Sequence, residues 1–430
     1  MFRFAPSPTG DMHIGNLRVA LFNYIISKQK NDKLIIRIED TDTERNIEGK
    51  DREILEILQK FNIEFSDVLY QSHNLKFHQQ FATTLLQTGR AFNCFCSSED
   101  LDKKREQAKI DKRAFRYDGT CEKLTNAEVL DIEKPSVIRI KKPDFEVKFA
   151  DIIKGEMSFK PNDIDNFILL RQDKRPTYNF ACAIDDMLSD IDTIIRGEDH
   201  LSNTPKQIAV QHSLGYNKKV NYAHLPIILN KDGKKMSKRD DASSVKWLFE
   251  EGFIPEAIAN YLILIGNKTP KEIFKIDEVF EWFKLENISK APAKFDMDKL
   301  RFINHEHLAL LEPEDLAKRI GHFDKTVGKI AKIYLEEAST LNELKSKIDA
   351  IFEKREVSEE FQEGVETLSK IIKDSDDFED FKDFKKYVMK ESGLKGKNFF
   401  KPLRVVLTGA ENGPELSKLY PLLKTYLKTI

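Results

Sequence analysis

The sequence predicts an α/β protein with a parallel sheet in its N-terminal part and an all-helical C-terminal third. Near the N-terminus, the apolar stretch FRFA at 2–5 leads through a turn rich in proline and glycine to a helical pattern, and then to the apolar stretch KLIIRIED at 33–40. Strand, loop, helix and strand in this order form a βαβ unit, which implies a parallel sheet. From about residue 250 onward the pattern is helical and is broken at prolines and glycines.

The first helix is expected directly after Gly15. Its apolar positions follow the spacing of one helix face: Leu17, Ala20, Leu21, Tyr24 and Ile25. Residues 51–92 are also expected to be helical. The stretches SVIRIKK and EVKFADIIKGEMSFK have β character and predict an insertion at about 94–182. After it, DTIIRGEDH at 192–200 predicts a return to the parallel sheet, with polar groups at the end of the strand.

Length and composition limit the class of protein. The chain has 430 residues, 40% apolar and 33% charged, which predicts about two to four domains with much exposed helix. A net charge of −2 excludes a chain that is basic as a whole, so any RNA contact must use local basic surface. The N-terminus lacks the pattern of a signal peptide, and the longest apolar runs, such as YLILI at 261–265, are too short to cross a bilayer. A cytoplasmic protein that binds no membrane is expected.

The turn FAPSPTGDMHIGN at 4–16 lies between the first predicted strand and helix. Backbone N–H groups and the helix dipole make such a position an anion site. Gly10 and Gly15 allow a phosphate to approach the backbone, and His13 adds a donor that can carry charge. Two interpretations follow: a nucleotide phosphate site, and an ordinary turn with a structural histidine. Taken alone, this motif favours the second.

A basic stretch, NKDGKKMSKRDD at 230–241, places four lysines and an arginine around a serine. A flexible loop of this composition suits the neutralisation of pyrophosphate during attack at an α-phosphate. The usual alternative for such a stretch is a solvated run of charge. The presence of both HIGN and KMSKR in one chain favours the functional interpretation.

PSPTGDMHIGN and KMSKR resemble the two signature motifs of class I aminoacyl-tRNA synthetases, HIGH and KMSKS. Five further stretches resemble the bacterial glutamyl-tRNA synthetases: RFAPSPTG at 3–10, RIEDTD at 37–42, PTYNFACAIDD at 176–186, IRGEDHLSNTPKQ at 195–207 and PLRVVLTG at 402–409. Asn16 replaces the second histidine of HIGH, and Arg239 replaces the last serine of KMSKS. Both changes are common in the glutamyl branch, although Asn16 cannot carry charge.

The resemblance implies four parts and one activity. The parts are a Rossmann-type catalytic domain at 1–85 and 186–235, an inserted α+β acceptor-stem-binding domain at 86–185, a stem-contact domain with the KMSKR loop at 236–310, and a helical anticodon-binding region at 311–430. The implied activity is that of a glutamate–tRNA ligase. Such an enzyme uses ATP to form glutamyl-adenylate and transfers the glutamyl group to the 3′ end of tRNA(Glu), tRNA(Gln) or both.

The resemblance also implies site residues. ATP, accompanied by Mg²⁺, is expected to contact Pro6, Ser7, Pro8, Thr9, Gly10, His13, Gly15, Asn16, Asp199, Lys235, Met236, Ser237, Lys238 and Arg239. Of these, His13, Lys235 and Lys238 are the expected catalytic residues: His13 holds ATP phosphates, and the two lysines stabilise the leaving pyrophosphate.

For L-glutamate, the resemblance assigns the side-chain carboxylate to Arg3, Tyr178 and Arg196, and the α-amino group to Glu39, with Ser7 nearby. The chemistry agrees, because arginine binds carboxylates in a fork geometry. The alternative for Arg3 and Arg196 is a surface ion pair with a neighbouring acid.

Cys94, Cys96 and Cys121 lie within one short segment, which fits a metal site better than disulfides. Together with Tyr117 they resemble a zinc site seen in many members of the family. The alternative is a zinc-free remnant held by packing, and both interpretations stay open. Cys182 lies elsewhere and is expected to be a pocket or core thiol.

Three rival functions are considered. A non-catalytic tRNA-binding paralogue would be expected to lose His13 or Lys238, and both are present. A glutaminyl-tRNA synthetase is disfavoured by the helical C-terminus and by the second arginine, and a nucleotidyltransferase would not need the C-terminal third. A monomer is expected. KGKNFFKPLR at 395–404 mixes basic and aromatic residues as an RNA contact would, but a packed helix end with Phe399 and Phe400 in the core is favoured.

Overall fold

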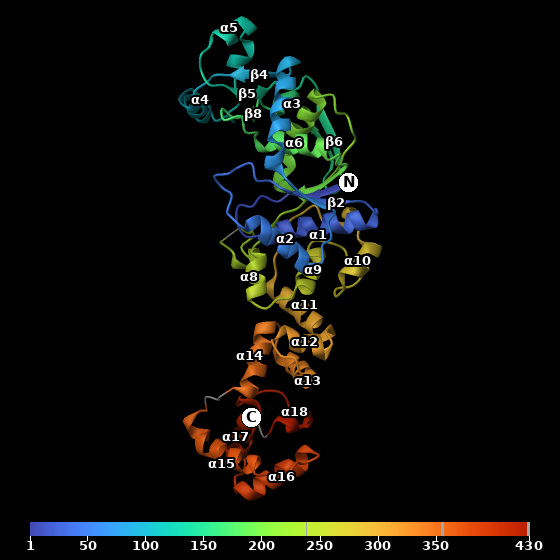
Figure 1. Cartoon of the computed structure of the whole chain (residues 1–430), viewed down its shortest axis with the longest axis vertical. Coiled ribbons are helices and arrows are strands. Elements are labelled where there is room, and N and C mark those ends of the chain that lie inside the picture. The colour runs from blue at the N-terminus through green and yellow to red at the C-terminus, as the bar shows by residue number, and fades with distance from the viewer. Residues whose placement is uncertain (238, 354–356, 428–430) are drawn as a thin grey trace. The chain divides into compact units, whose positions relative to one another are not determined.

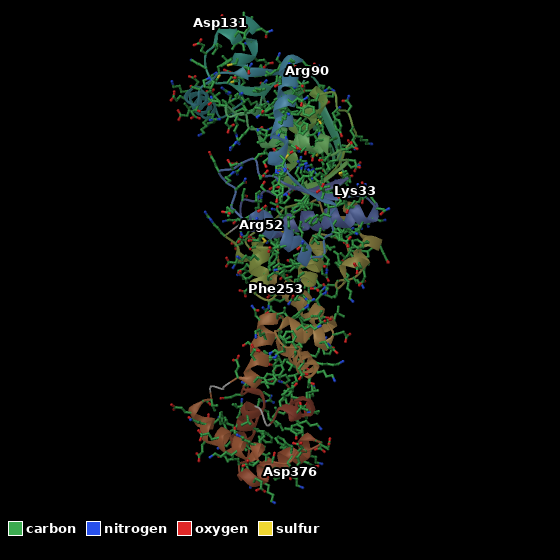
Figure 2. The ribbon with its side chains drawn as sticks, in the orientation of Figure 1. Lys33, Arg52, Arg90, Asp131, Phe253 and Asp376 are labelled. Atoms are coloured by element: carbon green, nitrogen blue, oxygen red, sulfur yellow. The ribbon has the colours of Figure 1, made fainter. Side chains whose placement is uncertain are left out.

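The structure is a computed structural model that describes residues 1–237, 239–353 and 357–427 (Figure 1). It consists of two compact units, Met1–Val245 with Leu262–Phe295, and Lys246–Tyr261 with Asp296–Ile430. Each unit is described by itself. In Figure 2, side chains fill the space between the ribbons of both units.

A parallel sheet begins the first unit, as predicted. Its strands are β1 (Phe2–Phe4), β2 (Leu34–Ile38) and β3 (Asp67–Tyr70), in the order β1-β2-β3. Helix α1 (Ile14–Gln29) connects β1 to β2, and α2 (Lys50–Lys60) connects β2 to β3. The five apolar positions predicted for the first helix are all buried, which confirms the helix. Burial extends beyond the one predicted face, because Arg18, Phe22 and Asn23 are buried as well.

A second sheet has the order β7-β6-β10-β9. Its strands are β6 (Val147–Asp151), β7 (Gly155–Phe159), β9 (Thr193–Gly197) and β10 (Asn221–Leu225), and β10 runs parallel to both β6 and β9. Helix α7 (Thr204–Ser213) connects β9 to β10, and β9 lies beside β1. The predicted return to the parallel sheet at 192 is therefore confirmed. The structure also adds β6 and β7, both from the predicted insertion, to this sheet.

The remainder of the predicted insertion surrounds a small antiparallel sheet. This sheet consists of β4 (Ala91–Cys94), β5 (Val137–Ile140) and β8 (Ile168–Leu170). The helices around it are α3 (Leu75–Gln87), α4 (Ser98–Ile110), α5 (Asn126–Asp131) and α6 (Tyr178–Leu188). Arg90, labelled in Figure 2, lies between α3 and β4.

The expectation of uninterrupted helix over 51–92 is wrong, because β3 and β4 interrupt it. Each strand has four residues, too few to show a period of two, and each forms only because a partner strand supplies its hydrogen bonds. The first unit also contains α10 (Ile276–Trp282) and the short parallel pair β11 (Ile228–Leu229) and β12 (Ala293–Lys294). The second of these strands lies in the region where only helices were expected.

The second unit is helical, as predicted, and contains no strand among its described residues. Its helices are α8 (Val245–Glu250), most of α9 (Pro255–Leu264), α11 (Met297–Leu310), α12 (Pro313–Arg319), α13 (Lys325–Tyr334), α14 (Leu341–Phe352), α15 (Gln362–Lys373), α16 (Phe381–Ser392), α17 (Lys397–Thr408) and α18 (Leu416–Leu423). On α17, Phe399 is buried but Phe400 is 45% exposed, so the expected packed helix end is right for the first residue and wrong for the second. No described helix combines the length and apolar character needed to cross a bilayer.

Candidate active site

Two adjoining cavities lie in the first unit, around the C-terminal ends of β1 and β9. The smaller has a volume of about 270 Å³ and is lined by Arg3, Phe4, Ala5, Pro6, Ser7, Thr9, Asn16, Val19, Glu39, Tyr178, Ile195, Arg196, Gly197 and His200. The larger has a volume of about 530 Å³ and is lined by His13, Gly15, Asn16, Arg18, Val19, Gly197, Asp199, His200, Leu225, Pro226, Ile227, Ile228, Lys235, Met236 and Ser237. They share Asn16, Val19, Gly197 and His200, so ligands in the two cavities could reach each other. In an open parallel α/β sheet this edge is where ligands bind.

The structure brings most of the predicted site residues together. All five residues expected to bind glutamate line the smaller cavity: Arg3, Ser7, Glu39, Tyr178 and Arg196. Of the residues expected to bind ATP, the larger cavity is lined by His13, Gly15, Asn16, Asp199, Lys235, Met236 and Ser237. The smaller cavity is lined by Pro6, Ser7, Thr9 and Asn16. Pro8, Gly10 and Arg239 are described but line neither cavity, and Lys238 lies outside the described residues.

Arg196 is a buried cation with one unused nitrogen. It lies near the C-terminal end of β9 and is 6% exposed. Its Nε donates to His224 Nε2 at 3.2 Å, and its Nη2 donates to Thr204 Oγ1 at 2.7 Å. Its Nη1 is buried and has no hydrogen-bond partner among the described residues. A carboxylate in the cavity would satisfy this nitrogen and compensate the charge.

Arg3 belongs to a buried network in which positive and negative charges match. Its Nε lies 3.1 Å from Asp186 Oδ1, which also accepts from Arg37 Nη1 at 2.5 Å. Arg37 Nη2 lies 3.3 Å from Glu39 Oε1, and the Cys182 thiol donates to the same oxygen at 3.0 Å. Burial raises the pKa of Glu39, and the positive charge of Arg37 opposes this shift. Both predicted arginines are therefore buried, and the surface ion pair considered for them is wrong.

Tyr178 and His200 link the two cavities. The Tyr178 hydroxyl lies 2.9 Å from His200 Nδ1. Burial, followed by the positive charge of Arg196, lowers the pKa of His200 to about 4, so this ring is neutral near pH 7. His200 was not among the predicted site residues. Its position directly after Asp199 in the stretch GEDH was the available signal.

His13 caps α1 and presents a nitrogen to the larger cavity. Its Nδ1 accepts from the Gly15 backbone N–H at 2.9 Å, which places the proton of the neutral ring on Nε2. Nε2 is buried and has no hydrogen-bond partner of ordinary geometry among the described residues. Burial lowers the pKa of His13, and the positive charge of Lys235 lowers it further. His13 thus offers a neutral N–H donor, whereas the sequence had suggested a donor that can be charged.

Gly15 is needed for this cap. A Cβ atom there would lie 3.1 Å from His13 Nδ1, closer than side chains ordinarily pack. A larger residue would therefore disturb the hydrogen bond that orients the ring.

The segment that contains KMSKR is folded against the turn that contains HIGN. The backbone N–H of Val245 donates to the Met12 carbonyl at 3.0 Å, and Ser244 pairs with His13 in a β-bridge. Lys235 Nζ lies 3.0 Å from Asp199 Oδ2, and both side chains are about half exposed. The two motifs, distant in sequence, therefore surround one cavity.

Comparison with known proteins decides the family. A model of the tRNA synthetases class I (E and Q), catalytic domain, matches residues 1–302, and a model of an anticodon binding domain matches residues 307–424. The chain belongs to the class I tRNA synthetases. This synthetase is 62% identical, over 100% of both chains, to glutamate–tRNA ligase 1 of a Nitratiruptor species. It is also 62% identical, again over 100% of both chains, to glutamate–tRNA ligase 2 of Sulfurimonas denitrificans.

A solved structure supports the same fold. This synthetase superposes with a TM-score of 0.84 and 27% identity on the crystal structure of a glutamate tRNA ligase from Elizabethkingia meningosepticum in complex with its amino acid. The match covers 100% of this synthetase and 97% of the other chain. The predicted combination of a parallel-sheet catalytic domain and a helical C-terminal region is confirmed.

The synthetase also has a cluster of metal-ligating atoms away from both cavities. The sulfur atoms of Cys94, Cys96 and Cys121 lie within 4.8 Å of one another. The separation between the Cys96 and Cys121 sulfurs is 3.6 Å, close to the ~3.8 Å that Zn–S bonds of about 2.3 Å impose in a tetrahedron. The Tyr117 hydroxyl lies 3.4 Å from the Cys94 sulfur and 3.5 Å from the Cys96 sulfur. The donor set therefore fits a zinc ion.

Asp186 and His224 are among the buried residues of the site that were not predicted. Asp186, which pairs with Arg3 and Arg37, ends the stretch PTYNFACAIDD that was noted in the sequence, so a local signal existed. His224, which accepts from Arg196, had no local signal. Its contact depends on the pairing of β9 with β10, which the sequence does not reveal.

Proposed function

We propose that this tRNA synthetase is a glutamate–tRNA ligase. In the first reaction, an α-carboxylate oxygen of glutamate attacks the α-phosphorus of ATP, which forms glutamyl-adenylate and releases pyrophosphate. In the second, a ribose hydroxyl of the 3′-terminal adenosine of tRNA loses its proton and attacks the glutamyl carbonyl, which releases AMP. The names of the relatives at 62% identity support this proposal.

The observation that carries the proposal is the unused nitrogen of Arg196. An uncompensated buried charge costs about 3–5 kcal/mol, so a ligand with an anionic side chain is favoured in the smaller cavity. Arg3 and the Tyr178 hydroxyl line the same cavity and would complete the carboxylate site. Glu39, on the same cavity, would accept from the α-ammonium group.

The larger cavity suits ATP. His13 Nε2–H and the N-terminus of α1 offer donors for phosphate oxygens. Because exposed ion pairs contribute little, about 0–1 kcal/mol, Lys235 can leave Asp199 for the pyrophosphate as charge develops. Mg²⁺ would accompany ATP as the counter-ion of its phosphates. The protein would supply position and charge, with no covalent nucleophile.

The remaining partners are proposed on coarser grounds. The match of residues 307–424 to an anticodon binding domain supports tRNA as the acceptor, and tRNA(Glu), tRNA(Gln) or both would be charged. Zinc would be held by Cys94, Cys96, Cys121 and Tyr117, where it would stabilise the small antiparallel sheet and take no part in the reaction. A cytoplasmic monomer remains the expectation.

A charging assay tests the function. The purified protein is incubated with ATP, radiolabelled glutamate or glutamine, and purified tRNA(Glu) or tRNA(Gln). We expect glutamate to be attached to at least one of the two tRNAs. Attachment of glutamine would instead support a glutaminyl-tRNA synthetase, and binding of tRNA without attachment of either amino acid would support a non-catalytic paralogue.

A further inference from the structure

Three neighbouring parallel strands end in a row of polar side chains. Arg196 on β9 is directly paired with His224 on β10, and Asp151 is the last residue of β6, which pairs with the other edge of β10. The side chain of Arg196 hydrogen-bonds to that of His224, which in turn hydrogen-bonds to that of Asp151. Only Arg196 lines the smaller cavity, while His224 and Asp151 lie behind it and are buried.

The contacts of His224 determine where its proton lies. Its Nδ1 lies 2.6 Å from Asp151 Oδ2, and its Nε2 lies 3.2 Å from Arg196 Nε. An arginine N–H can only donate, so Nε2 must be unprotonated and must accept. Nδ1 therefore carries the proton and donates it to Asp151.

Asp151 is itself held by the backbone. Its Oδ1 accepts from the N–H groups of Ile153 at 2.9 Å and Lys154 at 2.8 Å. Its Oδ2 accepts from the backbone N–H of His224 at 3.1 Å as well as from the imidazole. Every group that contacts this carboxylate is a hydrogen-bond donor. The imidazole must therefore donate from Nδ1 as well, which fixes the tautomer of His224.

We propose that Asp151 and His224 are positioning residues that hold Arg196 in the orientation required for the glutamate side-chain carboxylate. This proposal rests on the proposed function, because it takes Arg196 as the carboxylate receptor. With Nε bound to His224 and Nη2 bound to Thr204, the guanidinium plane cannot rotate, and Nη1 is left for the ligand. The β6 strand thereby contributes to amino-acid selection without touching the amino acid.

The other neutral tautomer of His224 would be unfavourable in this position. With a proton on Nε2, His224 would present an N–H to the Arg196 N–H, and two donors would face each other in a buried space. Burial lowers the pKa of His224, and the charge of Arg196 lowers it further, whereas Asp151 opposes the shift. A neutral ring with its proton on Nδ1 satisfies all three groups.

Two matched variants separate the contact of His224 with Asp151 from its contacts with Arg196 and Thr204, both made through Nε2. A glutamine at this position can extend a carbonyl oxygen to Arg196 Nε but loses the ring donor to Asp151. An asparagine can keep a donor to Asp151 but is too short to reach Arg196. We therefore expect His224→Asn to raise the glutamate KM about 10- to 100-fold, the usual effect of removing a hydrogen bond to a buried charged group. His224→Gln should raise it much less, and the KM for ATP should stay near the wild-type value in both.

A second pair of groups controls for loss of stability. His78 and Asp185 also form a buried pair in the first unit, with His78 Nε2 2.9 Å from Asp185 Oδ1, and neither lines either of the two cavities of the candidate site. The variant His78→Asn should lower the melting temperature but leave the glutamate-to-glutamine preference unchanged. Asp151→Asn should weaken that preference as His224→Asn does, because an amide at 151 must place donors against donors.

The outcomes distinguish failure of the positioning role from failure of the proposed function. The measurements are glutamate KM, ATP KM and the glutamate-to-glutamine preference in tRNA charging, together with side-chain ¹⁵N spectra of histidine that report the proton on Nδ1 of His224. If Arg196→Ala raises the glutamate KM but His224→Asn does not, the positioning role is wrong and the proposed function stands. Equal impairment of His224→Gln and His224→Asn, with a raised ATP KM, would show a merely structural role. If Arg196→Ala itself keeps the wild-type glutamate KM, both proposals fall.

Discussion

At the scale of single residues, the charges of the smaller cavity favour an anionic ligand. Arg3 and Arg37 are matched by Asp186 and Glu39, whereas Arg196 has hydrogen bonds only to neutral partners. An empty cavity thus leaves one buried positive charge without a counter-charge. Under the proposed function, glutamate would supply the counter-charge, whereas glutamine would place an uncharged amide there.

Replacement of Arg196 tests this account. Arg196→Ala should raise the glutamate KM sharply, by about 100-fold or more, since a buried charged contact contributes about 3–5 kcal/mol. The preference over glutamine should shrink, because it arises from the unpaired cation, and ATP affinity should change little. Steady-state charging assays measure all three quantities. Arg90→Ala, at an exposed arginine of the same unit, is the control, and a wild-type glutamate KM in Arg196→Ala would make Arg196 a structural residue.

His200 predicts a pH dependence of stability. Its pKa is about 4 in the folded protein against an ordinary value of 6.5, because burial and then the charge of Arg196 disfavour the imidazolium. Between these values the unfolded chain binds a proton that the folded chain does not, so stability falls as pH is lowered from about 6.5 to about 4. The contribution of His200 has an upper bound of about 3 kcal/mol. Urea unfolding of wild type and His200→Gln across this range should show a weaker dependence in the variant, and identical curves would contradict the assigned shift.

At the scale of elements, two helices of the second unit meet at a glycine. Gly328 lies on α13, and a Cβ atom there would come within 1.9 Å of the Pro313 carbonyl oxygen at the start of α12. No rotamer change can relieve a clash between a Cβ atom and backbone. The close approach of α12 and α13 therefore requires glycine at this position.

Gly328→Ala should destabilise the second unit by about 1–3 kcal/mol or more, the usual cost of overpacking. Gly321→Ala is the matched control, because its φ of +89° imposes strain but no atom lies within 4 Å of the added Cβ. Unfolding in urea, followed by circular dichroism, compares the two. A smaller effect at Gly328 than at Gly321 would show that α12 and α13 can separate without cost.

The cysteine cluster gives a prediction for the small antiparallel sheet. Protein purified without a histidine tag should contain about one zinc per chain by elemental analysis, because three sulfurs that lie within 4.8 Å of one another converge with the Tyr117 hydroxyl. Cys96→Ala should lose the metal, whereas Cys182→Ala should keep it, since Cys182 lies in the network of Glu39. A metal-free protein with full activity would instead support the zinc-free alternative.

At the scale of the whole molecule, the candidate active site and the anticodon-binding match lie in different units. Both cavities lie in the first unit, and the anticodon-binding match at 307–424 lies in the second. A tRNA that is charged in the first unit and read in the second must engage both. Activation of the amino acid can therefore be made to depend on the correct tRNA.

We expect glutamate-dependent ATP–pyrophosphate exchange to rise when tRNA is added. The expected increase is roughly 5- to 150-fold, the range of ordinary coupling energies between sites. Exchange is measured with glutamate alone, with tRNA(Glu), with tRNA(Gln), and with an unrelated tRNA as the control. Equal exchange in all four conditions would show that this synthetase activates glutamate without tRNA.

Part of the fold followed from local sequence signals, and most of the predicted site residues followed from the resemblance to a known family. The turn at 4–16, the helix after it and the strand at 33–40 each have a periodicity or composition that is complete within a few residues. For this reason β1, α1 and β2 were predicted. The five residues expected to bind glutamate, which all line the smaller cavity, followed instead from the resemblance to the glutamyl-tRNA synthetases. The short strands β3 and β4 were missed because their stability comes from partner strands that are distant in sequence.

By itself, the sequence determined the first βαβ unit and the helical character of the C-terminal third. Through its resemblance to a known family, it also indicated the family to which the chain belongs and many of the residues that line the two cavities. Tertiary structure alone decided how those residues are charged and oriented. Burial makes His13 and His200 neutral, and strand register places His224 beside Arg196 with Asp151 behind it. The physical reason is that periodicity and composition act within a segment, whereas desolvation and strand pairing depend on segments that meet only in the folded chain.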